Sequence, residues 1–133
     1  MIEKENVIVS LCAFGVVCRY HGKSHKMGHM LYKKNKTDEL MQKYNVIPLC
    51  GEIMGGMPTP RPPCNVCEGK VIGRFDGREY TAQYKNGAEE VLRLAKIFNV
   101  QKAFLLKDSP MCGKGYGILA KLLENNNIMV CNV

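Results

Sequence analysis

The chain has 133 residues, 46% of them hydrophobic, which is enough to bury one core and excludes global disorder. Its formal net charge of +7 permits an anionic partner, although a solvated basic surface explains that charge equally well. There is no Trp, and basic residues are not interleaved with aromatic ones, so the sequence gives little support for a nucleic-acid partner. We expect one domain over residues 1–133.

The 7 cysteines are irregularly spaced and odd in number, which argues against a secreted disulfide scaffold. The first residues carry charges of both signs, and the apolar segment at residues 7–18 is too short to span a bilayer. We therefore expect a cytoplasmic protein with no membrane partner, in which the thiols are free, catalytic or bound to metal.

Four short, almost continuously apolar runs predict strands that are covered on both faces, as in a parallel sheet. They lie at residues 7–11, 46–49, 103–106 and 128–131. Asp76-Gly77 lies between two further strand-like segments, residues 70–75 and 78–83, and predicts the turn of a hairpin.

Helices are predicted between these strands. The first spans residues 37–44 with Thr37 as its N-cap, and the second begins at a capping box that opens on Asn86 and ends near Asn99. A third covers residues 116–124, with leucines at helical spacing. The alternation predicts an α/β fold, a single-domain three-layer sandwich with a mostly parallel four-stranded sheet in the order 2-1-3-4, plus a small β-hairpin.

Cys12, Cys50 and Cys112 each follow the carboxyl end of a predicted strand. In an open parallel sheet these ends share one edge, where ligands bind, and neighbouring strands lie only ~4.8 Å apart. Three converging thiolates suit a soft metal, although a buried cysteine can also be a simple small hydrophobe. Zinc would need a fourth ligand or a water, whereas three cysteines on an iron–sulfur cluster leave one iron open.

The segment after Cys50 is rich in glycine and proline, and long loops of this kind inside compact domains are usually functional. It carries a carboxylate, Glu52, two residues after the thiol. A flexible Gly55-Gly56 pair follows, and then Arg61, whose guanidinium suits anions and carboxylates. This order of residues indicates a loop that presents chemical groups.

Four motifs together resemble the thiouracil desulfidase family over nearly the whole chain. They read Ser-Leu-Cys-Ala-Phe-Gly from Ser10, Cys-Arg-Tyr-His-Gly from Cys18, Cys-Gly-Glu-Ile-Met-Gly-Gly-Met-Pro-Thr-Pro-Arg from Cys50, and Ser-Pro-Met-Cys-Gly from Ser109. The resemblance implies a [4Fe–4S] cluster bound by three cysteines, whose fourth iron takes the sulfur of a thiolated uracil. Water then replaces that sulfur at carbon without net redox chemistry.

Carried over by motif, the metal ligands are Cys12, Cys50 and Cys112. Glu52 becomes the proton-transfer carboxylate and Ser109 a polar group near the substrate. The resemblance also implies that Gly55, Gly56 and Arg61 form the wall of a pocket for a small thiolated pyrimidine. The chain departs from the family pattern at Gly51, where proline is expected, and at Met111, where serine is expected.

Two other functions fit parts of the sequence. One is a non-enzymatic iron–sulfur or zinc module that senses metal or redox state. The other is an enzyme acting on thiolated RNA nucleosides, which would require salt-dependent RNA binding.

Several further residues have an ordinary structural explanation beside a functional one. Cys64 and Cys67 form a CxxC pair, which alone is half a metal site or a redox pair. Cys18 lies near Cys12 in the chain and fits a supporting role, and Cys131 fits the core. The histidines are spaced by four residues, but intervening glycines favour a solvated loop that contains His21, His25 and His29.

Overall fold

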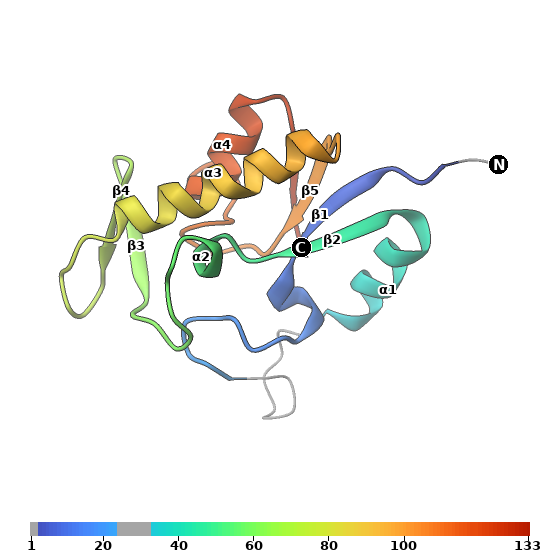
Figure 1. The fold of residues 1–133 in the computed structure, drawn as a ribbon. Coiled ribbons are helices and arrows are strands. Elements are labelled where there is room, and N and C mark those ends of the chain that lie inside the picture. Colours follow the sequence, from blue (N-terminus) through green and yellow to red (C-terminus); the bar gives the residue numbers. More distant parts are fainter. Residues whose placement is uncertain (1–2, 24–32) are drawn as a thin grey trace.

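The computed structural model describes residues 3–23 and 33–133 (Figure 1). Its elements, in chain order, are β1 (Asn6–Ser10), the short 3-10 helix η1 (Leu11–Phe14), α1 (Lys34–Lys43), β2 (Asn45–Leu49), α2 (Gly51–Met54), β3 (Cys64–Cys67), β4 (Lys70–Gly73), α3 (Thr81–Ile97), β5 (Lys102–Leu105), α4 (Ile118–Asn125) and β6 (Met129–Asn132). No helix within these ranges is both long and apolar enough to cross a membrane.

The main sheet has four strands in the order β2-β1-β5-β6, and every neighbouring pair is parallel. In this spatial order they are the second, first, third and fourth predicted sheet strands along the chain, so the predicted order 2-1-3-4 is confirmed. The central strands β1 and β5 bring the segments after Ser10 and Leu105 side by side, and β2 lies next to β1.

Helices cover both faces of this sheet, which gives the predicted three layers (Figure 1). Alternate residues of β1 point to opposite sides, as the period of a strand requires. Ile8 packs in the cluster that contains residues of α3 and α4, whereas Val7 and Val9 pack with Leu40 of α1 and with Tyr44, which directly follows α1. Each such fully buried side chain contributes about 1.5–3 kcal/mol by leaving water.

The small hairpin exists, but its predicted position was wrong. Its strands are β3 and β4, which pair antiparallel around Glu68 and Gly69. Both turn residues have positive φ, 50° and 78°, as a two-residue hairpin turn with the twist of the strands requires. Asp76-Gly77 does reverse the chain, but only one isolated bridge joins the segments around it, because α3 already begins at Thr81.

Two predicted helix starts were also wrong. The first helix begins at Lys34, and Thr37 lies inside it, buried, with its hydroxyl donating to the Lys34 carbonyl. The second begins at Thr81, one and a half turns before Asn86, which is an exposed residue within the helix. In both cases a polar residue that caps helices well lies inside one, since packing of the helix outweighs that preference.

Gly87 serves the contact between α3 and α2 rather than a helix start. A Cβ at Gly87 would lie 1.8 Å from the Gly51 oxygen, and a Cβ at Gly55 would lie 1.9 Å from the Gln83 oxygen. The two helices therefore touch backbone to backbone, and only glycine permits that approach. This contact fixes α2, and with it Glu52, against α3.

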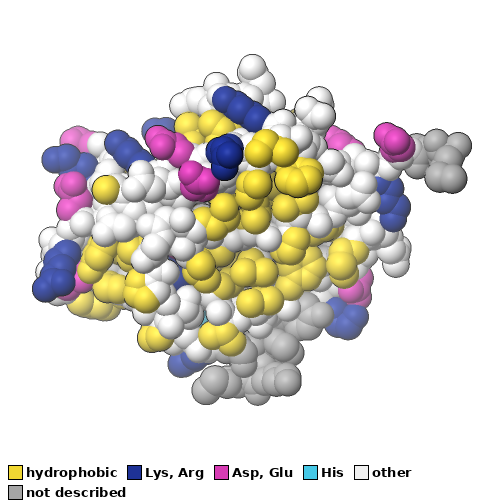
Figure 2. Space-filling model, viewed as in Figure 1, with side chains coloured by type: hydrophobic (Ala, Val, Ile, Leu, Met, Phe, Trp, Pro, Cys, Tyr) yellow, Lys and Arg dark blue, Asp and Glu magenta, His cyan; other side chains and the backbone are white. Residues whose placement is uncertain are grey.

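On the face of the molecule in Figure 2, Lys and Arg side chains are scattered and interleaved with Asp and Glu, with apolar side chains between them. They do not gather into a single basic surface on that face. The net charge of +7 therefore fits a solvated surface better than an electrostatic footprint for nucleic acid on this side.

Gly87→Ala is expected to destabilise the protein by about 3 kcal/mol, the upper end of the range for overpacking, because backbone atoms must move aside. An ordinary helix shows the opposite sign, with Ala favoured over Gly by about 1 kcal/mol. Urea unfolding followed by circular dichroism measures the difference. Asn86→Ala, at the exposed neighbouring position, is the control and should leave stability unchanged or raise it slightly. A stabilised Gly87→Ala protein would contradict the contact.

Candidate metal and substrate pocket

One cavity lies at the carboxyl ends of the sheet strands and is lined by residues far apart in the sequence. It contains the three predicted ligands, with Cys12 from η1, Cys50 from the end of β2 and Cys112 from the loop after β5. Glu52, Arg61 and Ser109 line the same cavity. Convergence at this edge was the central prediction for the site, and the strand order accounts for it.

Cys18, a fourth thiol, lies between two of these three. It is 1% exposed, and its S–H is placed to donate a hydrogen bond to a thiolate at Cys12 or at Cys50. That hydrogen bond is the main cause that lowers the pKa of the Cys12 thiol and that of Cys50, the latter to about 7. The pKa of Cys18 itself is raised, because its proton is held between two sulfurs. Two of the three predicted ligands, Cys12 and Cys50, are thus ready to supply thiolates.

Cys112 lies deeper, and burial raises the pKa of its thiol. Ser10 donates a hydrogen bond to its sulfur at 3.7 Å and accepts one from the Leu106 amide at 2.9 Å. The hydroxyl of Ser109 accepts hydrogen bonds from the amides of Met111 and Cys112, both at 3.1 Å. The Ser109 side chain therefore shapes the turn that carries Cys112, in addition to lining the cavity.

Glu52 is held by two donors that reach the same carboxylate oxygen. Arg61 Nε and the Tyr84 hydroxyl each donate to Oε2 at 2.9 Å. Arg61 Nη1 also donates to the Cys18 carbonyl at 2.8 Å, so a single guanidinium joins Glu52 to the Cys18 loop. Burial and the Glu52 charge raise the pKa of Tyr84, which keeps its phenol protonated as a donor.

A mononuclear metal site is not formed by the cysteine cluster. Across residues 3–23 and 33–133, no three His, Cys, Asp or Glu side chains are grouped so as to hold one metal ion. The three thiols nevertheless share one cavity, and a cluster with several irons needs its thiolates at separate corners rather than around one centre. The donor set, three sulfurs with no histidine, is the one that iron–sulfur clusters use.

Some residues singled out in the sequence lie elsewhere. Gly55 and Gly56 do not line the cavity, and Gly55 packs against the α3 backbone. Cys64 is buried and lines the cavity, whereas Cys67 is exposed and does not, so the two CxxC thiols lie in different environments.

The other candidates lie away from the cavity. Cys131 packs against the cluster that α1 covers, as expected of a core residue. His21 lies in the loop after η1 and is not among the lining residues. His25 and His29 lie outside the described residues.

Two residues of the site were missed by the sequence analysis, Tyr84 and Ser10. One sequence feature indicated Ser10, since it is a polar residue in an otherwise apolar strand, two residues before Cys12. No sequence pattern indicated Tyr84, because it precedes the predicted helix start at Asn86, and within the observed helix it has the spacing of an ordinary core residue.

Ligands of open parallel α/β domains bind at the carboxyl ends of the strands, and cysteines gathered there define a metal- or cluster-binding class of protein. The family model described as 2-thiouracil desulfurase matches residues 7–132. The uncharacterized protein YbbK of Bacillus subtilis (strain 168) is 31% identical, over 83% of this chain and 74% of that protein. The chain therefore belongs to the 2-thiouracil desulfurase family, as the resemblance of its motifs predicted.

A solved structure described as a [4Fe–4S]-dependent thiouracil desulfidase, TudS, has the same fold. It matches with a TM-score of 0.84 and 32% sequence identity, covering 97% of this chain and 91% of that one. The cofactor named for that protein is the one that the sequence analysis expected here.

In protein stripped of metal with a chelator, iodoacetamide should modify Cys50 with a midpoint near pH 7, since the thiolate reacts and forms above the pKa. Buried Cys112 should stay unmodified over the same range. Cys18→Ala removes the hydrogen bond to the Cys50 sulfur and should move the midpoint to higher pH. Peptide mass spectrometry of pulse-labelled samples measures this, and an unmoved midpoint in Cys18→Ala would contradict the role of Cys18.

Proposed function

We propose that this protein is a cytoplasmic iron–sulfur-dependent desulfidase that removes sulfur from thiolated pyrimidines such as 2-thiouracil. A [4Fe–4S] cluster would be bound by Cys12, Cys50 and Cys112. The single observation that carries the proposal is the convergence of these three thiols in one cavity with a held carboxylate, Glu52. Membership of the family and the cofactor of the similar solved structure support it.

With only three protein thiolates, such a cluster keeps one iron that can act as a Lewis acid toward a thiocarbonyl sulfur. The rest of the chemistry needs groups from the chain. The overall reaction exchanges C=S for C=O, consumes one water and releases hydrogen sulfide, so no electrons are transferred. It therefore requires a base for the attacking water and a donor for the departing sulfur.

Glu52 would carry out both proton transfers. It lines the cavity within the same wall as Cys50, and its position is fixed by Arg61 and Tyr84. A carboxylate can take the proton of the water and return it to sulfur, because it cycles between two protonation states. Arg61 acts here through Glu52, since its Nε and Nη1 already donate to protein acceptors.

Ser109 is the remaining polar side chain assigned to the substrate. Its oxygen accepts two backbone amides, which leaves its hydroxyl proton to donate toward the cavity that it lines. A donor in this place suits the carbonyl oxygen or ring nitrogen of a pyrimidine, and its orientation is fixed by the turn that carries Cys112.

Cys12→Ala, Cys50→Ala and Cys112→Ala should each lose the cluster, because a three-ligand site has no spare thiolate. Anaerobically reconstituted wild type should bind about four irons per chain with a broad absorption near ~400 nm. Iron and sulfide analysis together with the spectrum measure this. Cys67→Ala, which changes an exposed thiol outside the cavity, is the matched control and should keep full iron content. Zinc without iron in anaerobic wild type would overturn the proposed cofactor.

Glu52→Gln should keep the cluster but slow sulfide release from 2-thiouracil by about 100- to 10,000-fold, the usual contribution of a positioned acid–base group. The amide retains the shape of the side chain but cannot accept a proton in this pH range. Sulfide release per bound cluster, measured under anaerobic conditions, reports the effect. Glu90→Gln on the exposed side of α3 is the control. Undiminished turnover in Glu52→Gln would remove Glu52 from the mechanism.

A further inference from the structure

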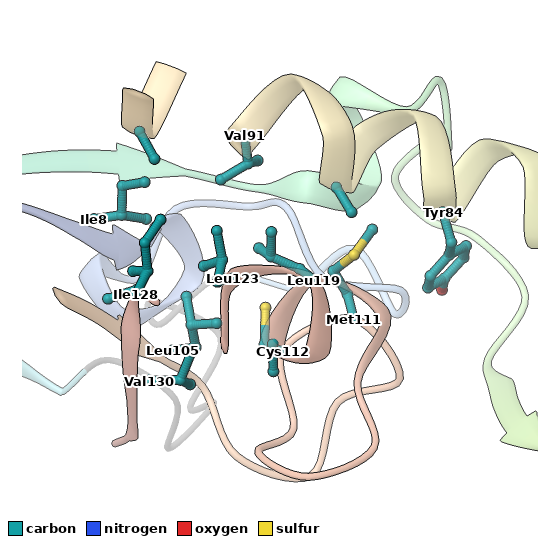
Figure 3. Close-up of a cluster of buried hydrophobic side chains, with 14 of the residues drawn as sticks. Ile8, Tyr84, Val91, Leu105, Met111, Cys112, Leu119, Leu123, Ile128 and Val130 are labelled. Carbon is teal, nitrogen blue, oxygen red and sulfur yellow. The ribbon is translucent and has the colours of Figure 1, made fainter. Parts of the chain in front are cut away.

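Among residues 3–23 and 33–133, Tyr84 is the largest fully buried side chain, yet it also lines the cavity. Figure 3 shows its ring projecting from α3 beside Met111. The hydroxyl donates to Glu52 Oε2 at 2.9 Å. We propose that Tyr84 is a positioning residue for the reaction, which orients the Glu52 carboxylate so that its other oxygen, Oε1, faces the substrate. This inference rests on the proposed function.

Both donors bind one oxygen of the Glu52 carboxylate, Oε2, and leave the other oxygen, Oε1, for the substrate side. Arg61 and Tyr84 both bind Oε2, and they come from different segments, the loop after α2 and the helix α3. Within the described residues, no group donates to Oε1, and Oε1 is not among the buried polar atoms without a partner. Oε1 is thus the carboxylate oxygen that no donor from the described part of the chain occupies, in a side chain that lines the cavity.

Two donors are needed because one hydrogen bond would leave the carboxylate free to rotate about it. Of the two donors, only Arg61 is charged. Its guanidinium also donates to the Cys18 carbonyl, so its position depends on the loop that contains Cys18. Tyr84 supplies a second fixed point from a helix. Misplacement of a reacting group by about 1 Å can cost a factor of about 100 in rate, so a second anchor has a kinetic value.

The position of Tyr84 is itself fixed by the backbone contact between α2 and α3. Tyr84 precedes Gly87 by three residues and so shares its face of the helix. Gly87 allows α3 to approach the Gly51 carbonyl, directly beside Glu52 in the chain. The aromatic ring spans the short remaining gap to the carboxylate. A phenylalanine would fill the same space in the core but would leave Oε2 with one donor.

The test compares Tyr84→Phe with Tyr80→Phe. Tyr80 lies one helical turn earlier, also donates its hydroxyl to a carboxylate, Asp76, and does not line the cavity. Sulfide release from 2-thiouracil is measured per bound cluster, with iron content determined in parallel. We expect Tyr84→Phe to retain iron and KM and to lower kcat about 10- to 100-fold, the value of a hydrogen bond to a charged group. Tyr80→Phe should match wild type.

A double-mutant cycle with Glu52→Gln separates positioning from a general structural effect. If Tyr84 acts through Glu52, the Tyr84→Phe change should cost nothing further in the Glu52→Gln background. Equal losses in both backgrounds overturn the proposal, as does an unchanged kcat in Tyr84→Phe.

A second measurement uses cluster-free protein and thermal unfolding, so it does not depend on activity. The loss of melting temperature caused by Tyr84→Phe should be smaller in the Glu52→Gln background than in wild type, and equal losses would overturn the contact. Wild type that releases no sulfide would instead refute the proposed function, whereas active wild type with unaltered Tyr84→Phe refutes only this inference.

Discussion

The buried ion pair between Arg61 and Glu52 is the interaction on which the rest of the site depends. Their side chains are 3% and 12% exposed, so both charges have left most of their water. The cost of that burial is offset because each partner also makes hydrogen bonds, Arg61 to the Cys18 carbonyl and Glu52 to Tyr84. Removing either charge would leave the other unpaired, which typically costs about 3–5 kcal/mol.

Arg61 also connects segments that no helix or strand connects. Its backbone amide donates to the Tyr20 carbonyl, and Nη1 donates to Pro58 as well as to Cys18. The loop after α2, the loop after η1 and α2 itself therefore form one body. Cys12 lies in η1, directly before the first of these segments, and Cys50 directly precedes α2, so the ion pair links the backbone next to two of the site's thiols.

Patterns over several residues predicted the architecture well, whereas single-residue signals failed. The apolar runs gave the strands, and the positions of Cys12, Cys50 and Cys112 after three of them predicted one cavity, because parallel strands end at a common edge. Asp76-Gly77 and Asn86 each suggested a boundary that tertiary packing overrode. Local preferences amount to about 1 kcal/mol, and the packing of α3 against α2 and the sheet exceeds that.

The site was predictable where chemistry requires rare residue types and unpredictable where it uses common ones. Cysteines after three predicted strands, with a carboxylate and an arginine in the loop after one of them, indicate a functional site from the sequence alone. Tyr84 occupies a core position with normal helical spacing, and only the location of its hydroxyl distinguishes it from an apolar residue. Gly55 was predicted to contact the substrate, yet its lack of a side chain allows α2 to pack against α3. A glycine needed for close helix packing and a glycine needed for a flexible loop look the same in a sequence.

Gly51 and Met111, where the resemblance of the motifs leads us to expect proline and serine, are neighbours in space. A Cβ at Gly51 would lie 3.2 Å from the Met111 methyl carbon, and Met111 is fully buried. Gly51 is the first residue of α2, where proline is favoured because its fixed φ suits a helix start. Glycine gives up that preference but vacates the space that the larger methionine fills.

Glycine at position 51 and methionine at position 111 complement each other in volume, as a well-packed core requires. Since Gly51 separates Cys50 from Glu52 and Met111 precedes Cys112, their contact packs two segments of the cavity against each other. Neither Gly51 nor Met111 lines the cavity, whereas Cys50, Glu52 and Cys112 all do. The contact therefore belongs to the packing that supports these three side chains.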